Sequence, residues 1–373
     1  MKFAAEKNEL YEIISNASKA CAMKSALNIL DGILLNLDGN TLTATGYDLE
    51  IGIKVSMQVD GHENGKVVVD PKLLGEMIKK MSGDNVNFEL SDNKVLKVTS
   101  GKSKLTVPNK PGEEFPNIIE IKKEDSTQVS FEMNSKLLKE MFSRVSYAVS
   151  RIKPEFEAIK LEIVDGVLYT VATDTNRLAA KHCPIANENV DFIIPEKAVS
   201  SLLRSLSDDA DENVSICVSQ NQISISKPNY VLISRLIENK FVNYKRIFEA
   251  PFNRALTVDV KEFILSMERC LYLQSDKLKI PVTCSFEDSF MKLSCKTTYG
   301  SIDDEVAITI VEGEFSDFDI NFNPRFMLEA LQKVTTEQVR IDYEGSFKPF
   351  KITSPDPAQA GEFIHIVVPV RSI

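Results

Sequence analysis

The fold is decided by a segment that occurs three times: KVVVDPKLLGEMIKKM at 66–81, DFIIPEKAVSSLLRSL at 191–206 and DINFNPRFMLEALQKV at 319–334. Each copy reads as a short apolar strand and then a helix that starts at a proline, where a missing N–H costs nothing. Because self-similarity along a chain is the signature of repeated units, we predict three copies of one module. The aligned positions are Pro71, Pro195 and Pro324, followed by Leu73, Leu74, Met77, Ile78 and Met81; Ala198, Val199, Leu202, Leu203 and Leu206; and Phe326, Met327, Ala330, Leu331 and Val334.

Another strand and amphipathic helix precede each of these segments. They begin at Lys2 (KFAAEKNELYEIISNASKA), Ser130 (SFEMNSKLLKEMFSRVSYA) and Leu256 (LTVDVKEFILSMERCLYL). Their apolar residues have the spacing of one buried helical face, so each module is predicted to contain two helices. The aligned positions in the first two copies are Leu10, Ile13, Ile14 and Ala17, and Leu138, Met141, Phe142 and Val145.

Alternating apolar and polar runs around the helices predict antiparallel strands. Asp38-Gly39 and Asp165-Gly166 are predicted hairpin turns, and CSFEDSFMKLSC at 284–295 holds the same place in the third copy. We therefore predict an α+β fold in which two helices of each module lie on an antiparallel sheet. The predicted domains are residues 1–121, 127–249 and 251–373, with junctions at Ile121–Thr127 and Glu249–Pro251.

The composition of the chain excludes several classes of protein. Its 373 residues exceed one compact core and fit about two to four domains. No apolar run reaches the roughly 20 residues of a membrane helix, and the charged start MKFAAEKNEL is unlike a signal peptide, so we expect a cytoplasmic protein. The six cysteines form no CxxC pair, so we expect reduced, mostly buried thiols and neither a zinc site nor another cofactor.

Basic residues recur on the helix that follows each proline, on the side away from its apolar stripe. The net charge of −10 argues against indiscriminate binding to nucleic acid or membranes. A solvated surface explains any one of these helices, but recurrence in three diverged copies favours a face that binds phosphate without sequence specificity. The positions are Lys72, Lys79 and Lys80; Lys197 and Arg204; and Arg325 and Lys333, with Lys136, Lys139 and Arg144 on the first helix of the second copy.

Seven local strings make the chain similar to the bacterial sliding clamp, the beta subunit of DNA polymerase III, over nearly its whole length. They are MKFAAEKNEL from Met1, TATGYDLEIGI from Thr43, PGEEFP from Pro111, VATDTNRLA from Val171, SRLIENKFVNYKRI from Ser234, FNPRFMLEAL from Phe322 and VVPVR from Val367. The resemblance implies three domains of the DNA clamp fold and a head-to-tail homodimer. The dimer would form a ring around duplex DNA, with the helices lining the hole.

The function that the resemblance implies is that of a processivity factor without catalysis. A closed ring stays on DNA by topology, and a polymerase bound to it is kept at high effective concentration near its template. The implied partners are duplex DNA, encircled without sequence specificity, a second copy of the chain, the replicative DNA polymerase, the clamp loader and other proteins with clamp-binding motifs. No membrane partner is implied, and the protein would be cytoplasmic and associated with the nucleoid during replication.

The resemblance also implies which residues contact DNA and which close the ring. The implied DNA contacts on loops are Lys24, Arg151 and Lys153. Pro154 and Glu155 stand where the family often has aromatic residues in this loop, which weakens that assignment. Ring closure is implied between the first and third domains, although core packing explains the same residues: Leu105, Val107, Tyr272 and Leu273.

A peptide-binding pocket is implied between the second and third domains. Its residues are Phe156, Thr173, Asn176, Arg177, Leu178, Val242, Arg246, Ile247, Asn323, Phe326, Val367, Val368, Pro369, Val370 and Arg371. Apolar strand ends beside two arginines suit an amphipathic peptide, but core packing explains Leu178, Val367 and Val368 equally well. Thr175-Asn176 replaces the usual Gly-His, and Val242 stands where proline is frequent, so the peptide preference is open.

Two other functions compete with the clamp interpretation. Asp174 beside Arg177 is the best catalytic candidate, because an aspartate in a strand-end loop can serve acid–base or metal chemistry. However, Asp48 holds the equivalent place in the first copy, which favours a structural role in the shared fold. No P-loop, GxSxG or HExxH motif is present. A scaffold that binds only proteins is the second rival, and the basic helix faces argue against it.

Overall fold

The computed structural model describes residues 1–22, 26–91, 95–121, 129–208, 212–274, 280–359 and 361–371. The chain falls into two compact units. The first unit comprises residues 1–139 and 197–236, and the second comprises residues 140–196 and 237–373. The boundary crosses helices α3 (Ser135–Val145) and α4 (Glu196–Leu203), so the second repeat contributes to both units. Most of the predicted first junction, residues 122–127, lies outside the described residues.

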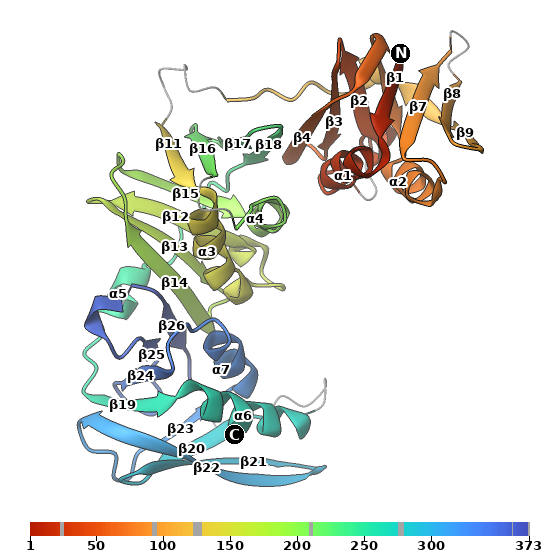
Figure 1. Ribbon diagram of the computed structural model, residues 1–373. Helices are drawn as coiled ribbons and strands as arrows, with labels where there is room; N and C mark the ends of the chain where they lie inside the picture. The colour runs from red at the N-terminus through yellow and green to blue at the C-terminus, as the bar shows by residue number, and fades with distance from the viewer. Residues whose placement is uncertain are drawn as a thin grey trace. The chain divides into compact units, whose positions relative to one another are not determined.

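The first unit holds two antiparallel sheets and the helices α1 and α2 (Figure 1). The strand order is β5-β1-β7-β8-β9 in the smaller sheet and β10-β6-β2-β3-β4-β18-β17-β16-β11 in the larger. Helix α1 packs against α2 and against β3 and β4. The elements are β1 (Lys2–Glu6), α1 (Lys7–Ser18), β2 (Ile33–Asp38), β3 (Thr41–Tyr47), β4 (Ile51–Gln58), β5 (Asp60–Glu63), β6 (Gly65–Val69), α2 (Pro71–Lys80), β7 (Asn85–Leu90), β8 (Leu96–Ser100), β9 (Ser103–Val107), β10 (Asn109–Pro111), β11 (Val129–Asn134), β16 (Asn213–Val218), β17 (Gln222–Lys227) and β18 (Tyr230–Arg235).

The second unit is built on one 12-stranded antiparallel sheet. Its order is β15-β12-β13-β14-β26-β25-β24-β19-β22-β21-β20-β23, and helix α6 packs against α7. The elements are β12 (Ala158–Val164), β13 (Val167–Thr173), β14 (Arg177–Pro184), β15 (Val190–Pro195), α5 (Tyr244–Phe248), β19 (Arg254–Asp259), α6 (Val260–Tyr272), β20 (Val282–Phe286), β21 (Phe290–Thr297), β22 (Gly300–Glu312), β23 (Asp319–Phe322), α7 (Pro324–Leu331), β24 (Gln338–Tyr343), β25 (Phe350–Thr353) and β26 (Ile364–Val367).

Strands from successive repeats join each of the large sheets. In the first unit, β4 of the first repeat pairs with β18 of the second, with Ile51 opposite Ser234. In the second unit, β14 of the second repeat pairs with β26 of the third, with Arg177 opposite Val367. In both cases the last strand of one repeat pairs with the third strand of the hairpin series in the repeat before it. These hairpin series are β2-β3-β4 and β12-β13-β14. The two joints are copies of one arrangement.

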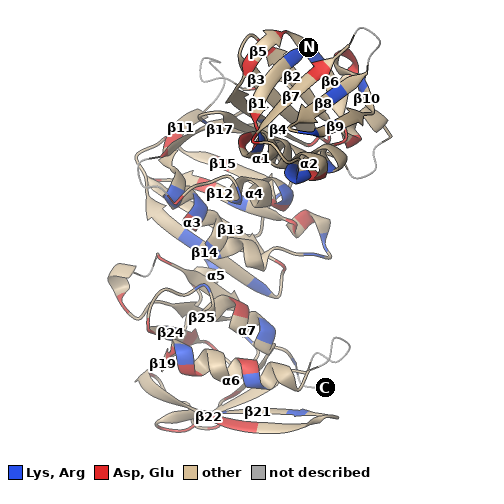
Figure 2. Cartoon of the chain, turned by 45° about the vertical axis from the view of Figure 1, so that its right-hand side comes forward, with Lys and Arg blue, Asp and Glu red and all other residues tan. Residues whose placement is uncertain are grey.

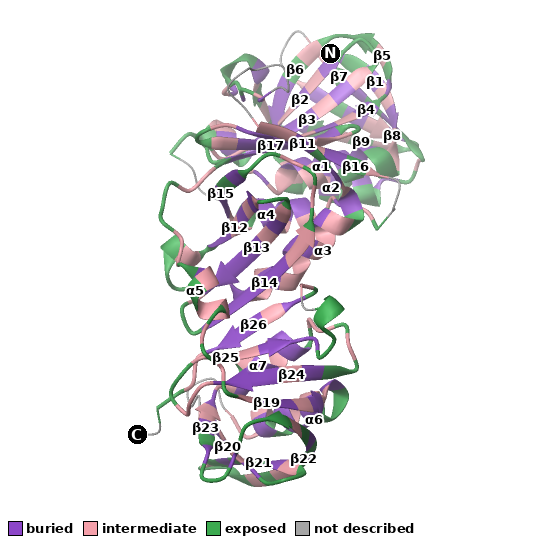
Figure 3. Ribbon diagram, turned by 90° about the vertical axis from the view of Figure 1, so that its left-hand side faces the viewer, coloured by how far each residue is buried: buried purple, intermediate pink, exposed green. Residues whose placement is uncertain are grey.

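Local sequence explains where these elements begin and turn. At the predicted Asp165-Gly166 hairpin both residues have positive φ, 51° and 76°, as a two-residue turn with the twist of the strands requires. The side chains of Asp70, Asp259 and Asn323 accept hydrogen bonds from backbone N–H groups at the starts of α2, α6 and α7. Figure 3 shows buried residues running along the strands β12, β13 and β14.

Two details of the predicted repeat are wrong. Pro195 does not open a helix: it ends β15, where it pairs with Ala158, and α4 begins at Glu196. Leu73 and Met77 were predicted to be buried, but 37% and 41% of their surfaces are exposed, because α2 turns Leu74 and Ile78 toward the interior instead.

The remaining structural expectations concern cysteines and membrane segments. All six cysteines are free thiols, and Cys217, Cys270, Cys284 and Cys295 are buried. In the described parts of the chain, no helix is both long and apolar enough to cross a membrane.

Candidate functional site

The turn that precedes β4 in the first repeat has the same structure as the turn that precedes β14 in the second. Asp48 Oδ1 accepts hydrogen bonds from the N–H groups of Glu50 and Ile51, at 2.9 and 2.7 Å. Asp174 Oδ1 accepts from the N–H groups of Asn176 and Arg177, at 2.9 and 3.0 Å. The two aspartates therefore close equivalent turns of the repeated fold, as the alignment of the first and second copies in the sequence predicted.

The residue after each aspartate has a left-handed backbone. Leu49 has a φ of 76° and Thr175 a φ of 77°. This conformation is unfavourable for residues other than glycine, and most of all for a β-branched one such as threonine. Thr175 therefore introduces backbone strain next to Asn176, in one wall of the predicted peptide pocket.

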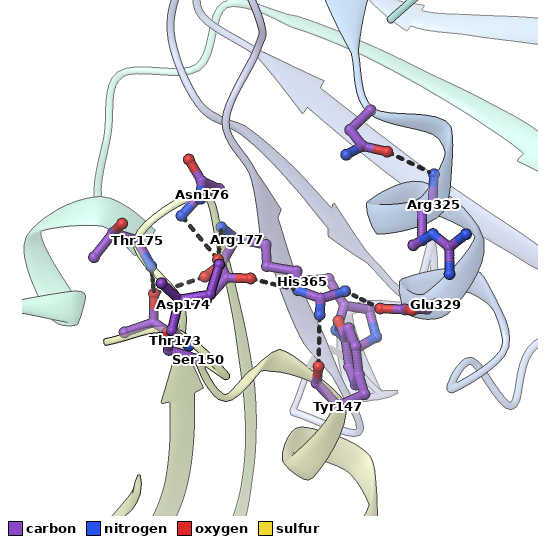
Figure 4. A network of polar contacts seen from close by, with 12 residues as sticks. Tyr147, Ser150, Thr173, Asp174, Thr175, Asn176, Arg177, Arg325, Glu329 and His365 are labelled. Carbon is purple, nitrogen blue, oxygen red and sulfur yellow. Dashed lines mark hydrogen bonds and ion pairs between the residues drawn. The ribbon is translucent and has the colours of Figure 1, made fainter. Parts of the chain in front are cut away.

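Arg177 is the centre of a polar network in the second unit (Figure 4). Its guanidinium donates to Asp174 Oδ2 at 3.1 Å, to the backbone oxygen of Tyr147 at 2.7 Å and to a carboxylate oxygen of Glu329. The same group lies over two aromatic rings, 5.1 Å from the centroid of Tyr147 and 4.7 Å from that of Phe326. Only 9% of Arg177 is exposed. The arginine is thus a buried, fully engaged support of the pocket wall rather than a free group for gripping a peptide.

Tyr147 links this network to a buried histidine. Its hydroxyl lies 2.9 Å from Nδ1 of His365, whose ring is 1% exposed. Burial, together with Arg144 and Lys333, lowers the pKa of His365 to about 3, and burial raises the pKa of Tyr147. Both side chains are therefore neutral at physiological pH.

A cavity of about 520 Å³ opens beside this network. Asn176, Arg177, Asn323 and Phe326 from the predicted peptide pocket line it. The predicted DNA contacts Arg151, Lys153 and Arg325 line it too, and so do Tyr147, Val149, Ser150, Ile152, Asp174, Leu271, Gln274 and Glu329. Part of the predicted peptide pocket and part of the predicted DNA-binding surface therefore line the same cavity.

The apolar part of the predicted pocket surrounds helix α5. Leu178, Val242 and Ile247 pack in one cluster with Tyr244 and Ile366. The segment after β26 passes next to this cluster, because the N–H of Val368 donates to the backbone oxygen of Asn176 at 2.9 Å. The N–H of Val370 donates to the backbone oxygen of Asn321 at 2.7 Å.

The remaining predicted pocket residues differ in exposure. Thr173, Leu178 and Val367 are buried, so they support the pocket from behind. Phe156, in a single helical turn at Pro154–Phe156, is half-buried, as are Val368 and Pro369, whereas Arg246, Val370 and Arg371 are exposed.

Lysines and arginines lie along helices α2 and α7 (Figure 2). Of the predicted DNA contacts, five are exposed on helices, namely Lys72, Lys79, Lys80, Lys197 and Arg325, whereas Arg204 and Lys333 follow the ends of α4 and α7. Lys72, Lys79 and Lys80 lie on the outer side of α2, where Lys80 approaches Glu76 at 4.0 Å and Lys79 lies 5.5 Å from the ring of Tyr11.

The other predicted DNA contacts are less uniform. Arg151, Lys153, Arg204 and Arg325 are exposed and Lys333 is half-buried, while Lys24 lies outside the described residues. Lys197 forms an ion pair with Asp48, so part of its charge is neutralised within the first unit. On α3, Lys139 pairs with Asp208 at 2.8 Å, and Arg144 bonds to the backbone of Lys333.

The predicted ring-closing residues lie at the ends of the repeat series. Leu105 and Val107 belong to β9, the edge strand of the five-stranded sheet, where Leu105 is half-buried and Val107 is 1% exposed. Tyr272 is 90% exposed at the end of α6. The side chain of Leu273 lies beside Gly300, the first residue of β22, at 3.8 Å from the position a Cβ would take there.

Sequence reasoning missed Tyr147 and Glu329, which hold Arg177. Glu329 could have been found, because it lies one helical turn after Phe326 and Arg325 on the same side of α7. Tyr147 carries no local signal, since it reaches Arg177 and His365 only through tertiary packing. Within the described ranges, no group of three or more His, Cys, Asp or Glu residues could hold a metal ion.

Sequence models of the DNA polymerase III beta subunit match almost the whole chain. The N-terminal domain matches residues 1–119, the central domain residues 132–243 and the C-terminal domain residues 245–371. The repeated fold and these matches define a three-domain DNA clamp. The chain therefore belongs to the DNA polymerase III beta subunit family, the bacterial sliding clamps, and is a non-catalytic processivity factor.

Individual relatives agree with this assignment. The chain is 27% identical to the beta sliding clamp of Staphylococcus epidermidis and 26% identical to that of Staphylococcus aureus, each over 100% of both chains. It superposes on the DNA polymerase III beta subunit of Thermotoga maritima with a TM-score of 0.90 at 25% identity, covering 100% of both chains. The sliding clamp of Pseudomonas aeruginosa bound to griselimycin has the same fold, with a TM-score of 0.90, 23% identity and 100% coverage of both chains.

Proposed function

We propose that two copies of this chain close head to tail into a ring that encircles duplex DNA, slides on it and tethers the replicative polymerase, the clamp loader and other replication and repair proteins. The observation that carries the proposal is the repeated joint. β4–β18 and β14–β26 are two joints of one kind, and each uses the third strand of a hairpin series and the last strand of the next repeat.

Two strands of the same two kinds, β9 and β22, have no such joint within the chain. β9 ends the strand series β7-β8-β9, as β18 ends β16-β17-β18, and it lies at the edge of its sheet, whereas β22 is the third strand of the last hairpin series. Residues 308–312 of β22 pair with β19, but among the described residues no strand pairs with residues 300–307 on the side away from β21. A chain with complementary open edges at its two ends is suited to close a ring with a second copy.

The chemistry of the two edges supports their pairing. β9 carries Lys104 and is preceded by Lys102, while β22 carries Asp303 and Glu305, which are exposed. Tyr272, at the end of α6, and Tyr299, directly before β22, are exposed aromatic residues, and Leu73 and Met77 are exposed apolar residues on helix α2. The proposed interface residues are Leu105, Val107, Tyr272 and Leu273.

The proposed DNA-facing surface combines helices and loops. Exposed lysines and arginines attract the phosphate backbone without sequence information, so the ring can slide. The proposed residues are Lys24, Lys72, Lys79, Lys80, Arg151, Lys153, Lys197, Arg204, Arg325 and Lys333.

The proposed peptide pocket receives short apolar tails of partner proteins. It is formed by the α5 cluster, the turn at Asp174–Asn176, α7 and the segment after β26. The Pseudomonas relative is described in complex with griselimycin. We infer that a pocket of the same kind serves this chain for tails of the polymerase and the clamp loader.

The proposed domains are residues 1–121, 127–249 and 251–373, and the proposed location is the cytoplasm, at the nucleoid during replication.

Solution scattering combined with sedimentation tests the ring directly. We expect a dimer whose scattering requires a central hole as wide as duplex DNA. A monomer, or a dimer without a hole, would contradict the proposal.

A further inference from the structure

We propose that helix α1 limits how strongly the protein holds duplex DNA, because its exposed carboxylates Glu9 and Glu12 repel the phosphates that neighbouring basic residues attract. The inference rests on the proposed DNA-facing surface and assigns α1 a role in it. A ring that slides needs an attraction to the phosphate backbone that is easily broken. Glu9 and Glu12 weaken that attraction.

Helix α1 lies beside the proposed DNA contacts of α2. The two helices pack side by side in the first unit (Figure 1). Nζ of Lys79 on α2 lies 5.5 Å from the ring centroid of Tyr11 on α1. The same ring lies 3.6 Å from the position that a Cβ would take at Gly75 of α2. A phosphate bound at Lys79 therefore lies close to α1.

Arg204, another proposed DNA contact, lies near the same helix. Glu9, Glu12 and Arg204 line one cavity of about 550 Å³. Burial and the nearby Arg204 lower the pKa of Lys19 at the end of α1, whereas Glu12 raises it, so these charges act on one another. The two glutamates are thus close to two proposed DNA contacts, one on α2 and one after α4.

The charges that α1 leaves free are negative. Glu9 and Glu12 are exposed, and in the described parts of the chain neither forms an ion pair. The lysines of this helix are half-buried and bonded within the fold: Nζ of Lys7 donates to a backbone oxygen at 3.3 Å, and Nζ of Lys19 donates to Oδ1 of Asn16 at 2.6 Å. On α2, by contrast, three lysines are exposed beside a single glutamate.

Helix stability explains only one of the two glutamates. Glu9 lies in the first turn of α1, where the helix dipole favours a carboxylate. Glu12 lies in the next turn, where that effect has fallen off. Repulsion of phosphate accounts for both residues, because charges within about 10 Å of one another still interact at moderate salt.

The test compares two double variants of the full-length protein that lose the same number of negative charges. E9Q/E12Q removes the carboxylates of α1, and E113Q/E114Q removes two exposed carboxylates from a single helical turn at Gly112–Glu114. Gln keeps the size of each side chain, and all four positions are exposed, so both variants should fold.

The control carboxylates lie on the other face of the sheet from α1. Glu113 lines a cavity together with Thr43 and Thr45 of β3. Gly46, whose position alternates with theirs along the strand, abuts the backbone of Ala17 in α1. The second double variant therefore changes the net charge equally without changing the helical face.

Binding to a short fluorescein-labelled linear duplex is measured by fluorescence anisotropy at low salt. We expect E9Q/E12Q to bind about fivefold more tightly than the parent protein, and E113Q/E114Q to bind like the parent. The gain should shrink as the salt concentration rises. Once loaded on long stretched DNA, E9Q/E12Q should diffuse more slowly than the parent.

The outcomes separate this inference from the proposed function. An unchanged affinity of E9Q/E12Q overturns the role of α1 and leaves the proposed DNA-facing surface intact. An equal gain in both double variants assigns the effect to net charge and also overturns the inference. K79E should weaken duplex binding, and an unchanged affinity of K79E would instead contradict the proposed surface itself.

Discussion

The hydrogen bonds of Asp174 and Asp48 indicate a structural role for these aspartates and not a catalytic one. Asp174 accepts two backbone hydrogen bonds and one from the guanidinium of Arg177, and Asp48 makes the same backbone bonds in the first repeat. An aspartate that is needed to close a turn in two diverged copies is explained by the fold. The sequence suggested this from the position of Asp48 alone.

Replacing Asp174 by alanine tests that role. The variant leaves two backbone N–H groups and Nε of Arg177 without their acceptor, so we expect a loss of about 1–3 kcal/mol in the free energy of unfolding. Asp48→Ala should also destabilise the protein, because it removes the same turn bonds. Urea denaturation followed by circular dichroism measures both, and unchanged stability in either variant would count against the structural role.

His365 makes stability depend on pH. Its folded pKa is about 3, below the ordinary value of 6.5, so the unfolded chain binds more protons between these two values. The stabilisation is therefore complete above pH 6.5 and is lost as the pH falls, by up to about 2 kcal/mol at pH 5 for this one group.

The prediction is checked with His365→Asn, which retains a polar group near Tyr147 and cannot titrate. The difference in melting temperature between pH 7 and pH 5 should be smaller in the variant than in the parent protein. Identical pH dependence of the two proteins would show that His365 is not the responsible group.

At the scale of elements, periodicity predicted the helices and hairpins, because each depends on residues close in the sequence. Features that depend on residues far apart in the sequence were harder to predict. Leu73 and Met77 fit the apolar stripe of α2 and are nevertheless exposed, and Arg177 is buried only because Phe326, Glu329 and Tyr147 come together around it. Pairing of β4 with β18 and β14 with β26 also had no local signal, yet it carries the argument for a ring.

The position of Val367 affects how the peptide pocket can be tested. Removing residues 367–371 would delete a residue that pairs with both Arg177 and Phe350 in the sheet. Substitution of the exposed Val370 is therefore the cleaner way to disturb tail binding without damaging the joint.

Edge pairing predicts the effect of a proline in β9. Ser103 pairs with Ser100 next to the turn, so by alternation the N–H of Thr106 points away from β8, toward the proposed partner strand. Thr106→Pro removes that donor and should weaken the dimer at least about tenfold, whereas Thr106→Ala should leave it nearly unchanged. Sedimentation equilibrium measures both variants. Equal dimerisation of the two would show that β9 is not the closing edge.

For the whole molecule, charge explains how an acidic protein can hold DNA. The chain has a net charge of −10, so attraction to DNA must come from the local basic surfaces. Lys72, Lys79 and Arg204 are exposed, while Lys197 is paired with Asp48 and is a less suitable residue to test.

Replacing Lys72, Lys79 and Arg204 by Glu should reduce processive synthesis and should make processive synthesis depend less on the salt concentration. The melting temperature should stay nearly unchanged, because exposed charges contribute little to stability. Processivity is read from product lengths in primer extension with the cognate polymerase. Glu76→Lys, on the same helix α2, is the control that should not impair synthesis.

The central claim is that the protein is held on DNA by topology. The most direct measurement loads the labelled protein with its clamp loader onto a nicked circular plasmid, cuts the plasmid at one site and follows the bound fraction by gel filtration. A ring predicts that the protein remains on the circle and is lost once the DNA is linear. Equal retention on circular and linear DNA would contradict the account.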